Sequence, residues 1–341
     1  MIFHYFEGVI NHHEKQDALY KLAYIFSKCI GSIGVEIFLL LSGMGLYFSY
    51  TKNKDIGAFY KKRYTRVLIP YLMYGAVIWF ISDIIMLGKD FSRYLFDLSL
   101  FSFWQGGNKR LWFIAAIVVF YALFPLFYEV VTSKRYRLYT FLLIAFFVLA
   151  LYVSFLNKPK NFGINEIAAT RLPIFIFGIY AGRLAYEKKP VKAWHIALLS
   201  VIFIIKVLTA IMAVKGRFST LPPELKGINK WFSDTIGNRL SSSVFSLGFI
   251  FMIILILALI RQKWFEKFLI KTGSISLELY MCHVTIRGIV TSDKTFDMCD
   301  PVVYSIAMAA SVVLAIVLHI ASGAVINMIN NDKRKEGEAN A

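Results

Sequence analysis

The sequence has few acidic residues and very few cysteines. Among 341 residues there are 21 Asp and Glu and three Cys, against 38 Lys and Arg. Cys29, Cys282 and Cys299 lie too far apart for a metal-binding pair and are too few for a disulfide framework. The HExxH and CxxC motifs are absent, so we expect no metal site. The sequence also lacks a Walker phosphate-binding loop and a GxSxG nucleophile turn, which argues against an ATP-driven pump and a serine hydrolase.

Apolar residues, in contrast, are abundant. They make up 58% of the chain, Phe and Tyr alone number 31 and 19, and the mean hydropathy is +0.60. Because long apolar runs recur along nearly the whole chain, we predict an all-α fold. The expected architecture is a polytopic membrane bundle of about ten transmembrane helices, in a single domain over residues 1–341. The net charge of +17 fits positive loops at a cytoplasmic membrane face, so the expected partner is the lipid bilayer and not nucleic acid.

The sequence predicts nine full-length membrane helices after a shorter opening run. One of them carries Arg171 and Pro173, and we expect it to be buried among other helices, since polar groups are not tolerated facing lipid. The nine segments are about Ile30–Tyr50, Val67–Gly88, Leu111–Val131, Leu138–Leu156, Ile167–Gly182, Ala193–Val214, Leu240–Ile260, Gly273–Val290 and Val302–Ile329.

The predicted loops differ in their density of basic residues. One alternating set contains TKNKDIGAFYKKRYTR, TSKRYR, RLAYEKKPVK and RQKWFEKFLIK, and it is denser in Lys and Arg than the opposite set. The positive-inside rule places this set in the cytoplasm, together with the tail NNDKRKEGEANA. We therefore expect a multi-pass protein of the cell membrane with a cytoplasmic C-terminus.

The chain opens with MIFHYFEGVI, which as a helix rises only about 15 Å, roughly half of a bilayer core. His4 lies within this run, and Glu7 follows three residues later on the same helix face. A neutral imidazole in apolar surroundings suits a general base near neutral pH, and Glu7 could orient it. The alternative is a histidine at a partly solvated chain end, without a catalytic role.

Glu36 is the single charged residue in the apolar stretch GSIGVEIFLLLSGMGLYF. Ionisable groups inside membrane helices are costly and are functional candidates by default. Glu36 could hold a catalytic histidine or pair with an arginine, and the alternative is a purely structural buried ion pair. The glycines around it, Gly31, Gly34, Gly43 and Gly45, would permit a neighbouring helix to approach closely.

Two arginines stand in the basic stretch FYKKRYTRVLIPY. Arg63 and Arg66 are three residues apart, so they share one face of a helix, which we expect at its cytoplasmic mouth. Two guanidinium groups at one mouth suit a phosphorylated ligand, because each can donate two hydrogen bonds to a phosphate. The alternative is a positive-inside anchor, which is the interpretation we give to Lys61 and Lys62.

A polar stripe occurs near the end of the chain, in SISLELYMCHVTIRG. Its members recur at helical spacing, and we expect them to form interhelical hydrogen bonds more than catalytic contacts. His195 and His319 are single histidines in apolar segments, and we expect them to be packing residues. The stripe consists of Ser276, Tyr280, His283 and Arg287.

Five of these segments, in order along the chain, resemble motifs of the membrane acyltransferase-3 family. The stretch around Glu36 resembles the motif G-V-[D/E]-x-F-F-x-x-S-G, and FYKKRYTRVLIPY resembles R-x-x-R-[I/L]-x-P. NKRLWFIAAIVVFYALFPLF is similar to a helix that begins L-W-[F/Y]-[L/I] and continues with a tyrosine and a proline. RLPIFIFGIYAGRL resembles R-x-P-x-F-x-x-G-x-x-x-G, and GSISLELYMCHVTI resembles a closing S-x-x-x-Y-x-x-H helix.

This resemblance implies an O-acetyltransferase. Such an enzyme moves an acyl group, usually acetyl, from cytosolic acetyl-CoA to a hydroxyl of an exported or cell-surface carbohydrate, with no permanently bound cofactor. The implied acceptors are of the exopolysaccharide, lipopolysaccharide or peptidoglycan type. By the same resemblance His4 is the catalytic base, and Glu36 is its partner or a charge that lines the pore. The residues assigned to the acetyl-CoA site are Arg63, Arg66, Trp112 and Arg171.

The family pattern also places an arginine eleven positions before the histidine. For His4 that position lies seven residues before Met1. We therefore expect Met1 to be an internal methionine of a longer chain and the first helix to be truncated. Whether the chain is active in this form stays open at this point.

Two other classes of protein fit the same composition. A glycan flippase or small-solute transporter would also have ten helices and buried charges, although transporters often carry internal repeats, and none is visible here. A structural partner in a glycan-synthesis complex is the third alternative. Acetyl-CoA binding, or loss of O-acetyl groups from surface glycans in a deletion strain, would distinguish the enzyme from a transporter. Acetyl transfer by the 341-residue chain itself would exclude the structural partner.

Overall fold

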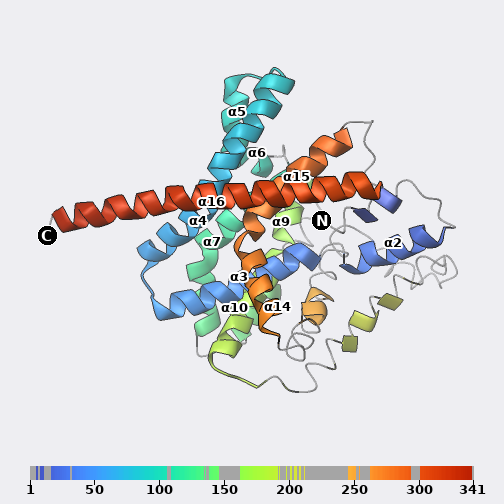
Figure 1. Cartoon of the computed structure of the whole chain (residues 1–341). Helices are drawn as coiled ribbons and strands as arrows, with labels where there is room; N and C mark the ends of the chain where they lie inside the picture. Colours follow the sequence, from blue (N-terminus) through green and yellow to red (C-terminus); the bar gives the residue numbers. More distant parts are fainter. Residues whose placement is uncertain are drawn as a thin grey trace. The chain divides into compact units, whose positions relative to one another are not determined.

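A computed structural model shows how the helices of the chain are built, and its described residues contain no strand (Figure 1). The described residues are 5–6, 8–10, 17–30, 33–105, 109–133, 135, 138–145, 162–190, 192, 197, 200–201, 203–205, 207–208, 211, 245–250, 253, 262–292 and 300–339. The all-helical prediction is confirmed for this part of the chain.

The chain divides into two compact units, each made from two separate stretches of sequence. The first unit comprises Met1–Lys54 and Leu123–Arg261, and the second comprises Asp55–Ala122 and Gln262–Ala341. Helix α7 (Trp112–Thr132) contributes its first part to the second unit and its last part to the first. Both units contain residues of the predicted site.

The first unit is organised around two helices in close contact, α3 (Ile33–Lys52) and α10 (Leu172–Tyr186). Helix α2 (Ala18–Ile30) packs against α3. Near the end of α3, the rings of Tyr47 and Tyr128 lie 5.2 Å apart between centroids, so the last part of α7 also packs here.

Helix α9 (Phe162–Ala169) ends just before α10 begins. Pro173 at the second position of α10 explains the break, because proline lacks an N–H and its ring clashes with the carbonyl four residues earlier. Arg171 stands at this break, as the residue before α10, and is buried together with most of α10. This confirms the expectation that the segment Ile167–Gly182 is buried among other helices.

The second unit contains α4 (Ile56–Trp79), α15 (Ser276–Ser292) and α16 (Pro301–Ala339), which pack against one another. Helix α16 is the long red helix of Figure 1. The π-helical segment η1 (Phe80–Met86) continues α4. The shorter helices of this unit are α5 (Phe91–Leu98), α6 (Phe101–Trp104) and α14 (Lys263–Ser274).

Five described helical stretches are long and apolar enough to cross a membrane. They correspond to five of the nine predicted segments, and the total of about ten stays a prediction. Gly273–Val290 corresponds to α15, which has 17 residues, and the other three predicted segments lie largely outside the described residues. The five stretches are Gly34–Lys52, Ile56–Met86, Trp112–Thr132, Glu166–Tyr186 and Pro301–Asn331.

Helix α4 begins eleven residues before the apolar run that predicted it. The Asp55 side chain caps the helix by accepting a hydrogen bond from the backbone N–H of Ala58, at 3.1 Å. The basic stretch with Arg63 and Arg66 is therefore helical, although apolar content alone would leave it in a loop. Two further predicted loops contain helices, α5 and α14, and the predicted polar tail continues α16.

Candidate functional site

In the first unit, Glu36 and Arg171 form a buried ion pair. The Nε atom of Arg171 lies 3.3 Å from Oε1 of Glu36, and the two side chains are 6% and 0% exposed. Arg171 Nη1 also donates a hydrogen bond to the carbonyl oxygen of Ile167, at 2.8 Å, so its side chain is anchored to the end of α9. Pairing with an arginine was one of the alternatives that the sequence left open for Glu36, and the structure shows that pair.

Glycine residues bring the two helices of this pair together. A Cβ atom added at Gly43 would lie 2.5 Å from the carbonyl oxygen of Phe175. One added at Gly178 would overlap the carbonyl oxygen of Leu40, and one at Gly182 would lie 3.0 Å from Cα of Met44. Backbone thus contacts backbone, which is how small residues permit close packing of membrane helices.

Two of the glycines named from the sequence do not take part in this contact. Among the described residues, nothing lies within 4 Å of a Cβ added at Gly34 or at Gly45. Gly31 lies outside the described residues. The close approach of α3 and α10 therefore depends on Gly43 of α3 and on the glycines of α10.

In the second unit, two tyrosines of α4 donate hydrogen bonds to the middle of α7. The hydroxyl of Tyr60 donates to the carbonyl oxygen of Ala122, at 2.8 Å, and that of Tyr64 donates to the carbonyl oxygen of Val118, at 3.2 Å. Arg63 lies between these two tyrosines in sequence. Arg63 therefore belongs to the part of α4 that contacts α7, whereas Arg66 contacts Glu278 of α15 and His319 of α16. Their expected position at a cytoplasmic helix mouth stays a prediction.

Arg63 and Arg66 have different surroundings. Arg63 is half-buried, and among the described residues no hydrogen-bond acceptor lies near its buried Nε atom. Arg66 is 40% exposed at its side chain, and its Nη1 atom lies 2.6 Å from Oε1 of Glu278, which is fully buried. Its Nη2 atom donates to the carbonyl oxygen of Ser274, at 2.6 Å, and lies 3.3 Å from Oε2 of Glu278.

His319 of α16 completes the group around Glu278. Its Nδ1 atom lies 3.1 Å from Oε1 of Glu278 and 3.5 Å from Nη2 of Arg66. One buried carboxylate therefore contacts two nitrogen groups from two other helices. We call Arg66, Glu278 and His319 the carboxylate cluster.

Trp112 stands at the start of α7 and is half-buried. The next residue, Phe113, donates its backbone N–H to the hydroxyl of Tyr280 at 3.3 Å, and the two rings lie 5.2 Å apart. Tyr280 lies two residues from Glu278 on α15. The residue after Trp112 therefore contacts the same helix that carries Glu278.

The contact between Tyr280 and Phe113 also agrees with the interhelical role predicted for the polar stripe. His283, of the same stripe, places Nδ1 2.9 Å from the carbonyl oxygen of Leu279, within its own helix. Sequence reasoning assigned no role to Glu278 and gave His319 only a packing role. The signal for Glu278 was present, because it is an ionisable residue inside a predicted membrane segment.

The proposed catalytic base, His4, and its neighbour Glu7 lie outside the described residues. In the part of the chain that the structure describes, no group of three His, Cys, Asp or Glu side chains could hold a metal ion. The predicted site residues that are described fall into two sets. Glu36 and Arg171 pair in the first unit, while Arg63, Arg66 and Trp112 belong to the second.

Comparison with known proteins gives one family and one distant relative. The family model described as "Acyltransferase domain" matches residues 1–320. Acyltransferase MdmB of Streptomyces mycarofaciens is 28% identical over 120 residues, which is 32% of this chain and 31% of that protein. The match thus spans about a third of the relative's length. No solved structure matches the chain.

Proposed function

Since this chain belongs to the membrane acyltransferase-3 family, we propose that it transfers an acyl group from acyl-CoA to a carbohydrate hydroxyl at the cell membrane. Acetyl is the proposed acyl group. The proposed acceptor is an exported or cell-surface glycan of the exopolysaccharide, lipopolysaccharide or peptidoglycan type. The C-terminus is proposed to be cytoplasmic, on the side from which acetyl-CoA is supplied.

The observation that carries the proposal is the unsatisfied donor on Arg63. Its Nε atom is buried and has no acceptor among the described residues. A buried donor without an acceptor costs about 1–3 kcal/mol, and a bound phosphate oxygen would remove that cost. Acetyl-CoA carries a pyrophosphate and a further phosphate, so its nucleotide end supplies acceptors of the required kind.

Arg66 supports the same assignment through its fixed orientation. Glu278 and the Ser274 carbonyl hold one edge of the guanidinium, and the side chain is nevertheless 40% exposed. An arginine held in one geometry loses less conformational entropy when it binds a phosphate through parallel N–H groups. We propose that Arg63 and Arg66 bind the donor phosphates and that Glu278 positions Arg66.

The proposed reaction needs a base and a leaving group. His4 takes the proton of the acceptor hydroxyl while the hydroxyl oxygen attacks the thioester carbonyl carbon. The carbon–sulfur bond then breaks, the acyl group stays on the sugar oxygen, and the CoA thiolate takes up a proton to leave as the thiol. Glu36 is proposed to hold His4 in the orientation that this proton transfer needs.

Donor binding tests the role of the arginines. Arg63→Ala and Arg66→Ala should each weaken acetyl-CoA binding roughly 10- to 100-fold, because a hydrogen bond to a charged group contributes about 1.5–3 kcal/mol. The matched control is Lys62→Ala, which removes one exposed positive charge from the same helix. Isothermal titration of the purified protein with acetyl-CoA measures the affinities. If Arg63→Ala binds the donor as tightly as the Lys62→Ala control, the proposed phosphate site is wrong.

Acetyl transfer tests the role of His4. His4→Ala should abolish transfer of radiolabelled acetyl groups to surface glycan, while donor affinity stays within a few-fold of the unmodified protein. A protein that inserts in the membrane, binds donor and keeps normal transfer without His4 would remove this residue from the mechanism.

A further inference from the structure

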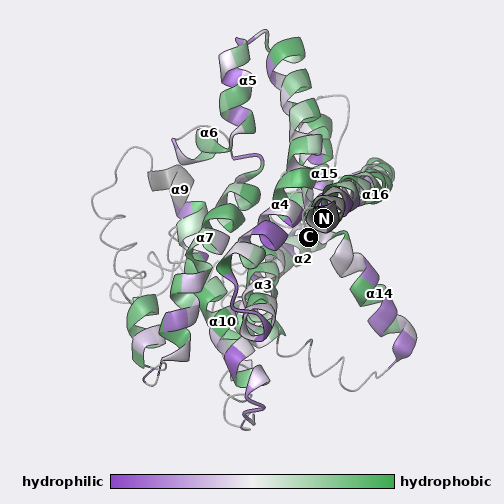
Figure 2. Cartoon of the chain, turned by 90° about the vertical axis from the view of Figure 1, so that its left-hand side faces the viewer, coloured by the Kyte–Doolittle hydropathy of each residue, from purple (hydrophilic) through white to green (hydrophobic). Residues whose placement is uncertain are grey.

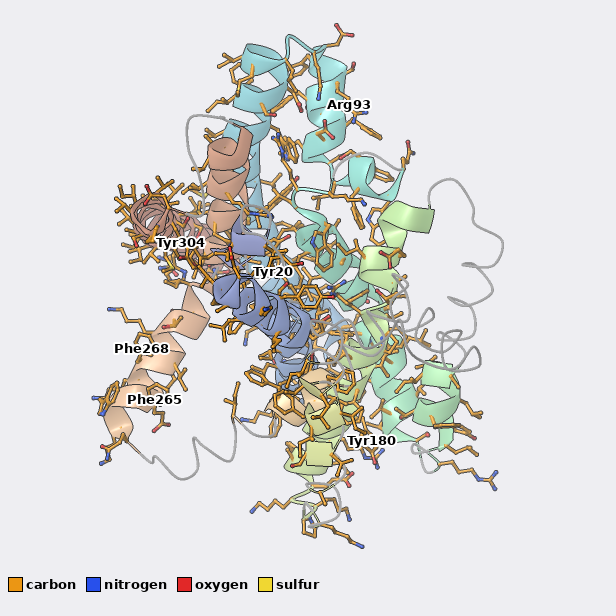
Figure 3. The ribbon with its side chains drawn as sticks, turned by 90° about the vertical axis from the view of Figure 1, so that its right-hand side faces the viewer. Tyr20, Arg93, Tyr180, Phe265, Phe268 and Tyr304 are labelled. Carbon is orange, nitrogen blue, oxygen red and sulfur yellow. The ribbon has the colours of Figure 1, made fainter. Side chains whose placement is uncertain are left out.

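Helix α14 (Lys263–Ser274) has an amphipathic surface that the described part of the chain leaves uncovered. None of its residues is buried, and among the described helices it packs against α15, the helix that follows it. Trp264 and Phe268 are 67% and 57% exposed. Figure 2 shows green and purple residues alternating along α14, and Figure 3 shows the rings of Phe265 and Phe268 on this helix.

Four of the five large apolar residues of α14 gather on one side, and the fifth, Ile270, lies outside this arc. At about 100° per residue, Trp264, Phe265, Phe268 and Leu269 fall within an arc of roughly 140°. The rings of Phe265 and Phe268 stack, with centroids 6.3 Å apart and planes 15° apart. Exposing four large apolar side chains to water is unfavourable, so we expect this arc to be buried against an apolar surface.

The lysines of α14 gather on a neighbouring side. Lys263, Lys267 and Lys271 are spaced four residues apart, so they form one row along the helix, directly beside the apolar arc. The remaining side carries Glu266 and Ile270. Lysines flanking an arc with Trp and Phe are typical of a helix that lies in the plane of a membrane surface.

We propose that α14 lies along the membrane surface, with its apolar arc in the lipid and its three lysines on anionic headgroups. Charge favours this occupant over an uncharged surface, because three lysines face outward and the helix has one acidic residue. The same unit also contains the candidate membrane spans Ile56–Met86 and Pro301–Asn331, so a lipid bilayer would lie close to α14. This inference goes beyond the proposed function and holds whether or not acyl transfer occurs.

Photocrosslinking tests the proposal on the full chain. Benzoylphenylalanine replaces Phe268 in one variant and Glu266, on the other side of the helix, in a matched control. Both proteins are reconstituted in vesicles of phosphatidylcholine alone or with a minority of phosphatidylglycerol, irradiated and analysed by mass spectrometry. We expect lipid adducts at position 268, few at position 266, and enrichment in phosphatidylglycerol adducts on the order of fivefold for each lysine that contributes.

A charge variant completes the test. Lys263→Gln, Lys267→Gln and Lys271→Gln together should abolish the enrichment in phosphatidylglycerol and keep the adducts with phosphatidylcholine. Equal lipid labelling at positions 266 and 268 would overturn the proposed orientation. Adducts at position 268 with a second copy of the chain or with another protein, in place of lipid, would overturn the proposed occupant. Enrichment that survives loss of the lysines would overturn their role.

Discussion

The ion pair between Glu36 and Arg171 allows a quantitative prediction. At 3.3 Å and an effective dielectric constant of about 20, the two charges attract each other by about 5 kcal/mol. Taking both charges out of water costs several kcal/mol for each ion, so the pair as a whole adds little net stability. Removing one partner is different, because the other charge then stays buried and has lost this ion pair. Glu36→Gln should therefore lower the free energy of unfolding by about 3–5 kcal/mol.

Removing the arginine should cost less unfolding free energy than removing the glutamate. A carboxyl group that loses its partner can bind a proton and become neutral, whereas a guanidinium group stays charged. Arg171→Met should therefore destabilise the protein by less than Glu36→Gln does. The double variant, with neither charge, should recover more than half of the loss caused by Glu36→Gln. The control is Glu187→Gln. It breaks the more exposed pair with Arg183 at the C-terminal end of α10 and should cost less than about 1 kcal/mol.

Reversible unfolding in mixed micelles, followed by circular dichroism, measures these free energies, and acetyl transfer is assayed on the same samples. Additive effects of Glu36→Gln and Arg171→Met would refute the reasoning, because they would mean that the two charges do not stabilise each other. The transfer assay separates the two roles of Glu36. A double variant that folds stably and has lost transfer supports the catalytic role, and one that keeps transfer makes the pair purely structural.

Two further predictions use the same unfolding assay. Gly178→Ala should lower the free energy of unfolding by about 1–3 kcal/mol, because the added Cβ overlaps the carbonyl oxygen of Leu40. The control is Gly45→Ala, where no described atom lies within 4 Å of the added Cβ, and it should cost nothing. Equal effects of the two substitutions would contradict the close packing of α3 and α10. Glu278→Gln should cost about 1.5 kcal/mol, less than Glu36→Gln, because Arg66 is 40% exposed and can be hydrated when its partner is lost; a larger cost than for Glu36→Gln would show that Arg66 is not accessible to water.

Several features of the fold were predictable because they depend on local sequence. The apolar runs of α3 and α7 lie within a few residues of the helices that form, and so does the start of α16, although that helix ends ten residues later than its run. The start of α4 was wrong by eleven residues, because hydropathy does not report helices in polar sequence. The cap at Asp55 could have indicated the earlier start, since aspartate followed by a helical stretch is a helix-start signal.

The partners of the charged residues were less predictable, because they come from distant parts of the chain. Glu36 was identified as a buried charge, but its pairing with Arg171 depends on the register of α3 against α10, which the glycine contacts determine. Glu278 was missed because it does not lie on the polar stripe of its helix. Its contacts, Arg66 and His319, lie 212 and 41 residues away in the chain.

The three described arginines of the predicted donor site are not equivalent. Arg171 is 6% exposed at its side chain, is paired with Glu36 and donates to a backbone carbonyl, so a phosphate would have to displace a buried carboxylate to reach it. Arg63 is only half-buried, and Arg66 is partly exposed with its guanidinium already oriented. We therefore assign donor binding to Arg63 and Arg66, and give Arg171 the task of holding Glu36. A carboxylate can accept about four hydrogen bonds, so pairing with Arg171 is compatible with the proposed hydrogen bond between Glu36 and the imidazole of a catalytic histidine.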